Sequence, residues 1–289
     1  MDAVLLAILS AALFGAMTVL IRLGFARSSD VRLASLTMTA IASGVTLLAW
    51  LLAGSGGDTS AGALWPFALA GILAPGLSQL LFISAIAESG AARASVVVGM
   101  APLVSVAIAL TALAEPVETA LLVGAVLIVL GGLALTTERI RPADFRVLGL
   151  LLAFLCTVLF STRDNLVRWL SADTDVSPLA ACSVSLLAGT VLMLAAALAR
   201  RERPSRARIA RSARAFAAAG LLFGLSYAAL FEAYYRGRVT VVSPLVSTES
   251  LWGVSLSALF LGATELVGRR LLVGAALVVA GGALIGAAS

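Results

Sequence analysis

Ten apolar runs, each about twenty residues long, constrain this chain more than any other feature of its sequence. A helix needs roughly 20 apolar residues to cross the hydrocarbon core of a bilayer. A lipid-exposed backbone satisfies its own hydrogen bonds as a helix, so such runs are expected to be helical. The pattern predicts an all-α integral membrane protein of about ten transmembrane helices. The runs lie near residues 3–24, 31–53, 65–87, 91–112, 117–137, 147–169, 177–199, 215–236, 238–262 and 267–288.

The composition supports a membrane protein and excludes several classes of site. Apolar residues make up 61% of the chain and charged residues 12%, about half the charged fraction of a soluble domain. Lysine and histidine are absent, which removes the commonest metal ligand and general base. Cys156 and Cys182 lie inside apolar runs, without disulfide or metal-site spacing. We therefore expect no metal and no cofactor, and the missing Walker A sequence argues against ATP hydrolysis.

The chain also repeats itself. Glu115–Gly132 matches Glu265–Gly282 without a gap, and the shared glutamate and glycines make chance an unsatisfactory explanation. The repeat unit is about half the chain, which predicts one five-helix repeat over 1–140 and a second over 145–289. Because five is odd, the second unit enters the membrane from the opposite side. Inverted repeats of this kind are typical of transporters, whose substrate site lies between the repeats near the midplane.

The arginines predict the orientation. They gather in the loops on one side of the predicted bundle, and arginine-rich loops stay in the cytoplasm, so both termini are predicted to lie outside. The densest run, Arg200–Arg214, has two interpretations: it fixes topology, or it binds anionic lipid headgroups. We favour the first, because the topology rule alone accounts for it. The arginines on this side are Arg27, Arg32, Arg93, Arg139, Arg141, Arg146, Arg200, Arg201, Arg203, Arg206, Arg208, Arg211, Arg214, Arg269 and Arg270.

Glu249 is the strongest candidate for a functional residue. It lies near the middle of the ninth run, close to Ser247, and a charge there costs roughly 2.5–3.5 kcal/mol even on a lenient insertion scale. We hypothesise that Glu249 lines a transport cavity, where it contacts a substrate amine or takes up a proton. The alternative is a structural carboxylate that bonds to a neighbouring helix.

The sixth run carries a polar stripe. Ser161, Asp164 and Arg168 recur at helical spacing, and Arg163 flanks them. One interpretation is a cavity wall formed by Ser161, Arg163 and Asp164. The other is an internal Asp164–Arg168 ion pair that fixes helix packing.

Three uncharged side chains complete the candidate site. Gln79 and Tyr227 occupy near-equivalent places in the third and eighth runs, and Trp252 lies on the ninth. Together they can supply hydrogen bonds and an aromatic wall for a small amphipathic ligand, and the alternative for each is interhelical packing. Tyr234 lies nearer the end of the eighth run and is expected to be an interface anchor.

Helix breakers fall inside three runs. They are Pro75-Gly76 in the third, Gly99 with Pro102 in the fourth, and Pro244 in the ninth. Interruptions at membrane depth are tolerated where the freed carbonyls face protein or a watery cavity. Glycines repeat in the fifth and tenth runs instead, which predicts close helix packing and a scaffold role.

The sequence resembles the EamA family of the drug/metabolite transporter superfamily over essentially the whole chain. The resemblance rests on Leu13-Phe14-Gly15, on Gly90-Ala91-Ala92-Arg93-Ala94-Ser95, on Ala101-Pro102-Leu103 and on two Glu-x-Val-x5-Val-Gly-Ala segments. It implies a ten-span carrier of small organic solutes, often an exporter, with a central cavity lined by both halves.

These observations predict a secondary transporter, not an enzyme, in a cytoplasmic (inner) membrane. Its expected partners are a small-molecule substrate and the lipid bilayer, with proton coupling open and no nucleic acid. A flippase for a lipid or lipid-linked sugar is the alternative, and a polar groove open to the bilayer would distinguish it. A membrane-embedded enzyme is disfavoured, because the sequence lacks the acid clusters or the His and Cys pairs that its chemistry needs. A non-transporting scaffold is disfavoured by Glu249 and by the inverted repeat.

Overall fold

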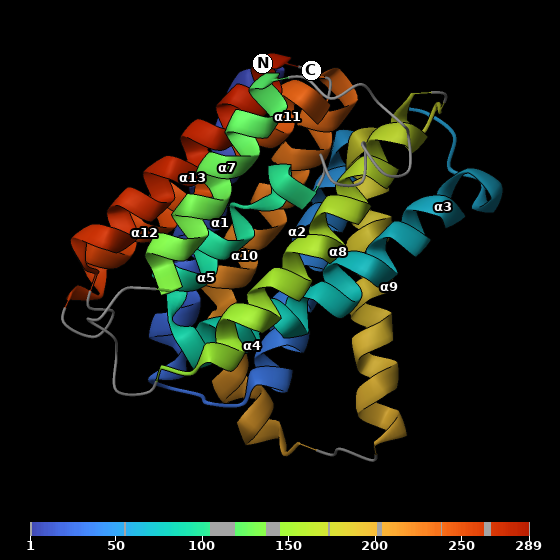
Figure 1. Cartoon of the computed structure of the whole chain (residues 1–289). Helices are drawn as coiled ribbons and strands as arrows, with labels where there is room; N and C mark the ends of the chain where they lie inside the picture. The colour runs from blue at the N-terminus through green and yellow to red at the C-terminus, as the bar shows by residue number, and fades with distance from the viewer. Residues whose placement is uncertain are drawn as a thin grey trace.

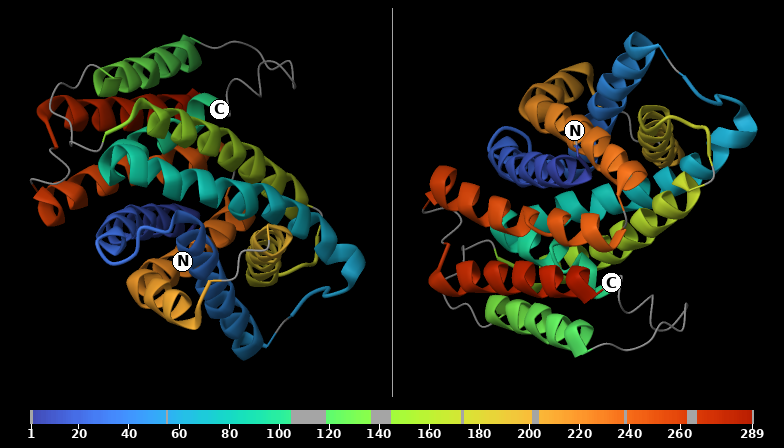
Figure 2. Two further views of the ribbon diagram at one scale, coloured as in Figure 1. Left: turned by 90° about the horizontal axis from the view of Figure 1, so that it is seen from below. Right: turned by 90° about the horizontal axis from the view of Figure 1, so that it is seen from above.

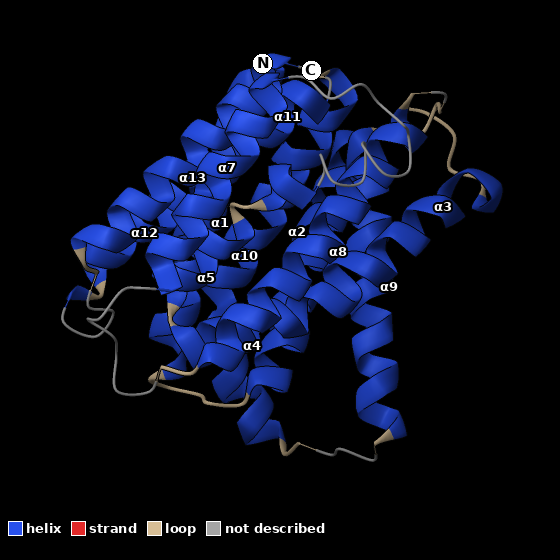
Figure 3. Ribbon diagram, in the orientation of Figure 1, coloured by secondary structure: helices blue, strands red, loops and turns tan. Residues whose placement is uncertain are grey.

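The computed structural model of the protein is a bundle of helices. It describes residues 2–54, 56–104, 119–136, 145–172, 174–200, 204–237, 239–262 and 267–288, and every regular element within these ranges is helical (Figures 1 and 3). The elements are α1 (Ala3–Phe25), α2 (Val31–Ala53), α3 (Ala61–Gly71), η1 (Ile72–Leu77), α4 (Ser78–Ser89), α5 (Ala91–Val98), α7 (Thr119–Thr136), α8 (Val147–Ser171), α9 (Pro178–Ala199), α10 (Arg206–Arg236), α11 (Val239–Val246), α12 (Glu249–Phe260) and α13 (Arg269–Ala288).

The predicted runs become helices with few exceptions. Six described segments are long and apolar enough to cross a membrane: Ala3–Phe25, Val31–Ala53, Ala61–Ser89, Val147–Ser171, Pro178–Ala199 and Arg206–Arg236. Residues 105–112 of the fourth predicted run lie outside the described residues, as do Glu115 and Glu265 of the repeat. The all-helical membrane architecture is confirmed for the described residues, and the number ten stays a prediction.

Short polar side chains begin several helices. Each accepts a hydrogen bond from a backbone amide three residues on, which satisfies one of the donors that a helix start leaves open. Asp30 starts α2 in this way, Ser60 starts α3, Ser177 starts α9 and Ser205 starts α10.

Two of the predicted interruptions fall where the helix breakers stand. The third run is broken at η1, where Ala74 leaves the helical conformation just before Pro75. The fourth run is broken by a turn at Gly99. In the ninth run Pro244 lies inside α11, and the break follows between Val246 and Glu249.

The two interrupted runs cross at their breaks. A side-chain carbon built on Gly99 would lie 2.8 Å from the Ser250 Cβ, and one built on Gly253 would lie 2.5 Å from the Ser95 Cβ. Ser95 also bonds to Thr18 of α1, at 3.3 Å between the hydroxyl oxygens. The centre of the bundle is therefore a close crossing of α5 with α12, which α1 supports.

This close crossing predicts that a valine at Gly253 destabilises the protein more than a valine at a glycine outside the crossing. Gly253→Val is expected to destabilise the protein by about 1–3 kcal/mol, because the added carbons meet Ser95. Gly44→Val is the control, because a carbon built on Gly44 meets nothing within 4 Å. Thermal unfolding of the purified protein in detergent measures both, and equal midpoints would contradict the crossing.

The glycine repeats of α7 and α13 face each other. A carbon built on Gly124 would meet the Gly281 carbonyl oxygen at 2.7 Å, and one built on Gly131 would meet that of Gly274 at 2.7 Å. Residue numbers rise along one helix as they fall along the other, so the two helices are antiparallel. Gly124 is the repeat equivalent of Gly274, and Gly131 of Gly281, so exchanging the halves reproduces the same contacts. The pair lies at one edge of the bundle (Figure 2), as an inverted duplication with a glycine-packed scaffold predicts.

The ends of the bundle differ in charge. The start of α1 and the end of α13 lie together at one end, and the end of α9 and the start of α10 lie at the other (Figure 1). Arg200 and the first turns of α10 are at that second end. One arginine of the loop set was wrongly placed: Arg93 is 1% exposed within α5, and its guanidinium carbon lies 5.8 Å from the centre of the Phe145 ring.

Candidate functional site

A buried ion pair on α8 is the centre of the candidate site. The Arg163 Nε lies 2.9 Å from the Asp164 Oδ1, and the two residues are 2% and 8% exposed. Two charges are stable at such a place only when they are close together, because each has lost its hydration.

Aromatic rings hold the guanidinium of Arg163. Its central carbon lies 4.6 Å from the centre of the Tyr227 ring, 5.6 Å from that of Phe160 and 5.9 Å from that of Phe231. A cation over ring faces gains electrostatic attraction, and the gain grows when water is excluded. Tyr227 and Phe231 lie one turn apart on α10. The contacts of Arg163 therefore link α8 to α10, the sixth and eighth predicted spans.

Glu249 brings a third charge to the same region. It is the first residue of α12, directly after the break in the ninth run, and it is 6% exposed. Its charge acts on Asp164, Arg163 and Cys156, which places all four near one another. Within the described part of the chain, no hydrogen bond or ion pair engages the Glu249 carboxylate. Two carboxylates and one guanidinium therefore make up this buried cluster.

Hydroxyl groups of α8 bind carbonyls of the interrupted fourth run. The Thr157 Oγ1 donates to the Val97 carbonyl at 3.2 Å, and the Ser161 Oγ donates to the Ala101 carbonyl at 3.2 Å. These carbonyls lie on either side of the turn at Gly99, where helical partners are disturbed. Ser161 thus lies one turn from the charged pair and stabilises the broken helix beside it.

The structure brings only some of the other predicted residues to this cluster. Gln79 is fully buried on α4, and its amide atoms lack a hydrogen-bond partner among the described residues. It precedes Phe82 by one turn, and the Phe82 ring lies 6.3 Å from that of Phe160. Ser247 is buried but donates to the Pro244 carbonyl at 2.7 Å.

Trp252 is the most exposed of the predicted site residues. It is 40% exposed, and the carbon that a side chain on Gly15 would add meets the Trp252 Cβ at 2.6 Å. The buried face of α12 carries Glu249, Gly253 and Ser257 instead. The role of Trp252 as an aromatic wall stays a prediction.

Two interpretations of the sequence were wrong. Asp164 pairs with its neighbour Arg163 and not with Arg168, whose Nη1 donates to the Tyr234 carbonyl at 3.0 Å. Tyr234 is 1% exposed and faces Asp164, so it belongs to the cluster and not to the membrane interface. The missed signal is helical spacing, because Tyr227, Phe231 and Tyr234 lie on one face of α10.

Comparison with known proteins identifies the family. The sequence model described as the EamA-like transporter family matches residues 1–137 and again residues 147–287. The chain belongs to the EamA-like transporter family. The two matches follow one another along the chain, in agreement with a two-repeat layout.

The fold of this EamA family member also resembles a solved structure. That structure, described only as a crystal structure of a protein, is 22% identical in sequence and has a TM-score of 0.61. The similarity covers 95% of this chain and 96% of the other, so the likeness extends over the whole fold. No curated protein matches the chain. Membership of the family and the apolar helices together make this chain a multi-pass membrane protein of a transporter family.

Proposed function

We propose that this EamA family protein is a secondary transporter that moves a small organic cation across the cytoplasmic membrane, and that Glu249, Asp164 and Arg163 form its binding site. The observation that carries the proposal is the buried position of Glu249 beside the Arg163–Asp164 ion pair. Arg163 balances one of the two carboxylates of the cluster, which leaves one negative charge in the cluster. A buried charge of this kind is expensive, so a cation or a proton is needed to neutralise it.

A substrate amine and a proton then compete for the same carboxylate. While the amine is bound, its positive charge balances Glu249, and after the amine leaves, a proton takes its place. Proton entry on one side of the membrane thereby drives amine release on that side. With the arginine-rich end in the cytoplasm, an inward proton gradient makes the protein an exporter.

The repeat and the helix breaks support alternating access. In the described structure the charged cluster is enclosed, because its three charged residues are at most 8% exposed. The interrupted helices α5 and α11–α12 cross beside it, and such breaks allow half-helices to tilt separately. Exchange of conformation between two inverted halves then opens the cluster to either side.

The enclosed cluster favours a solute carrier over a flippase. A flippase for a lipid or lipid-linked sugar needs a polar groove that is open to the bilayer, so that a headgroup enters sideways. Arg163, Asp164 and Glu249 are instead buried, and three aromatic rings surround the Arg163 guanidinium, which suits a small ligand.

A transport assay in liposomes tests the proposal. Purified protein is reconstituted with a pH-sensitive dye inside, and a panel of organic amines is compared with organic acids and neutral solutes of similar size. We expect that an outward gradient of a transported amine moves protons in the opposite direction, which changes the internal pH, and that acids do not. Preferential movement of acids, or no response to any amine, would contradict the assignment.

A further inference from the structure

The buried cluster contains hydrogen-bond donors that the described residues leave unused. Arg163 meets Asp164 through its Nε, whereas its Nη1 has no hydrogen-bond partner within the described residues. The Tyr227 hydroxyl is buried as well, and it too lacks a partner in the part of the chain that the structure describes. A buried donor without an acceptor costs free energy, so native proteins rarely keep one without a reason.

The two unused donors lie close to each other and to Glu249. The guanidinium carbon of Arg163 is 4.6 Å from the centre of the Tyr227 ring. Cys156 lies near both Tyr227 and Glu249, because it interacts electrostatically with each of them. One small molecule therefore has the reach to meet Glu249 with one end and the two donors with the other.

The charge of the cluster limits what can bind these donors. Glu249, Asp164 and Arg163 together carry one net negative charge, so a ligand with a single positive charge makes the cluster neutral. A zwitterion, with its carboxylate at Arg163, would leave that negative charge without a balance, which is expensive at membrane depth. The group that meets the two donors is therefore a neutral acceptor, such as a hydroxyl or an amide oxygen.

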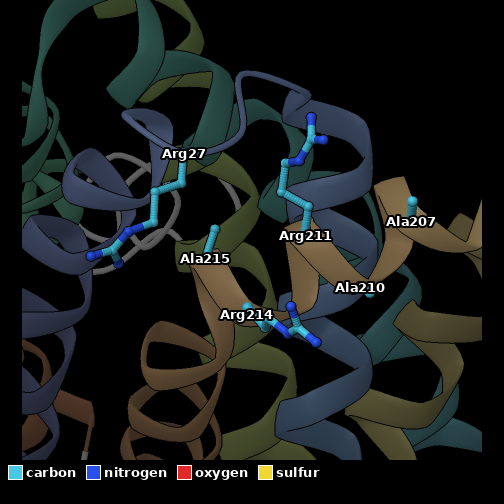
Figure 4. Close-up of a pocket in the computed structure, with 6 residues that line it drawn as sticks. All are labelled: Arg27, Ala207, Ala210, Arg211, Arg214 and Ala215. Atoms are coloured by element: carbon cyan, nitrogen blue, oxygen red, sulfur yellow. The ribbon is translucent and has the colours of Figure 1, made fainter.

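Two open pockets at the arginine-rich end of the bundle do not match such a ligand. One is lined by Arg27, Arg211, Arg214 and three alanines, and Figure 4 shows its guanidinium groups pointing in different directions. The other is lined by a single carboxylate, that of Asp30, which Arg208 already binds at 2.6 Å. As lined by the described residues, neither pocket presents an unpaired carboxylate to an amine.

We propose that the substrate is an organic amine that also carries a neutral hydrogen-bond acceptor, and that the Arg163 Nη1 and the Tyr227 hydroxyl bind this acceptor while Glu249 binds the ammonium group. The inference rests on the proposed function and narrows its substrate class. The Tyr227 ring holds the guanidinium in place, and the Tyr227 hydroxyl adds specificity. An amine without an acceptor leaves both donors unpaired, and a site that is built to bond an oxygen discriminates against such a ligand.

Three ligands with the same leucine side chain test the proposal. Leucinol carries an ammonium group and a neutral oxygen, its isostere with a methyl group in place of the hydroxyl carries the ammonium group alone, and leucine is a zwitterion. Binding to the purified full chain is measured from the rise in thermal midpoint with ligand concentration, at a pH at which both amines are protonated. We expect leucinol to bind about tenfold more tightly than its methyl isostere, and leucine to bind least.

Tyr227→Phe removes the hydroxyl and keeps the ring beside the Arg163 guanidinium. It is expected to lower the preference for leucinol over the methyl isostere from about tenfold to about threefold, because Arg163 still donates. A purely structural role of Tyr227 would weaken both amines by one factor and leave their ratio unchanged, which would overturn its role here.

Tyr235→Phe is the matched control. The Tyr235 hydroxyl is also buried without a partner among the described residues, but its ring packs against that of Phe67 on α3, with the ring centres 6.5 Å apart. The preference for leucinol is expected to stay at the wild-type value in this variant. An equal fall in Tyr235→Phe and Tyr227→Phe would overturn the assignment of the acceptor to Tyr227.

The wild-type results separate this inference from the proposed function. Equal affinities for leucinol and its methyl isostere would overturn the acceptor and leave the proposed function standing, because both amines would still bind. Tightest binding by leucine would mean that the donors meet a carboxylate, which would overturn the neutral acceptor. If neither amine bound, the proposed function and this inference would both be overturned.

Discussion

Glu249→Gln is expected to abolish the coupling of amine movement to protons and to weaken amine binding about tenfold to a hundredfold. Glutamine keeps the shape of the side chain but cannot carry the charge that balances the amine, and a hydrogen bond to a charged group contributes about 1.5–3 kcal/mol. The internal pH of liposomes measures coupling, and the ligand-induced rise in thermal midpoint measures binding.

The control for this change is Glu232→Gln. Glu232 is also a glutamate of a predicted span, but it is partly exposed and pairs with Arg236 at 2.8 Å. Transport by this variant is expected to stay near the wild-type rate. If Glu249→Gln transported amines with unchanged proton movement, Glu249 would be a structural carboxylate.

The two native cysteines give an independent readout of the same site. Cys156 lies near Glu249, and both Cys156 and Cys182 are fully buried. In a Cys182→Ser background, a transported amine is expected to slow maleimide labelling of Cys156, and the protection is expected to disappear in Glu249→Gln. If the amine changed the rate of Cys156 labelling in neither protein, the binding site would lie elsewhere.

The sequence predicts the fold well because lipid imposes simple rules. Apolar length alone locates the helices, and proline with glycine locates the breaks at Ala74 and Gly99. The glycine repeats of α7 and α13 predict their contact, because only close packing makes so many glycines useful. The break in the ninth run lies a few residues after Pro244 and not at it, since the helix continues to Val246 before it ends.

The candidate site was predicted only in part, because its contacts join helices that are distant in sequence. The cluster contains the predicted Glu249, Asp164 and Arg163, each recognisable as a charge at membrane depth. The prediction of an Asp164–Arg168 pair was wrong, because it considered only the spacing along one helix. The rings of α10, which lie around the Arg163 guanidinium, could not be inferred from that spacing. The exposure of Trp252 depends on which face of α12 packs against α5. The sequence of a single helix does not show which helices will pack against it.

The charge balance of the cluster predicts a ranking of stabilities. Arg163→Leu leaves two carboxylates without a cation, so it is expected to destabilise the protein by about 3–5 kcal/mol. Asp164→Leu leaves Arg163 to balance Glu249, so its effect is expected to be smaller. Glu249→Gln leaves the Arg163–Asp164 pair intact and is expected to retain or raise stability. Reversible unfolding in mixed detergent, with the single variants side by side, measures this order.

The double variant Arg163→Leu/Asp164→Leu tests whether the loss comes from an unpaired charge. Removing both partners is expected to recover most of the stability that Arg163→Leu loses, because a buried pair is often replaced by apolar groups at little net cost. The pair of Glu232 and Arg236 is the control, since its side chains are 30% and 50% exposed and an exposed pair contributes about 0–1 kcal/mol. Without recovery in the double variant, the packing of Arg163 against its three rings, and not its charge, would be what holds α8 to α10.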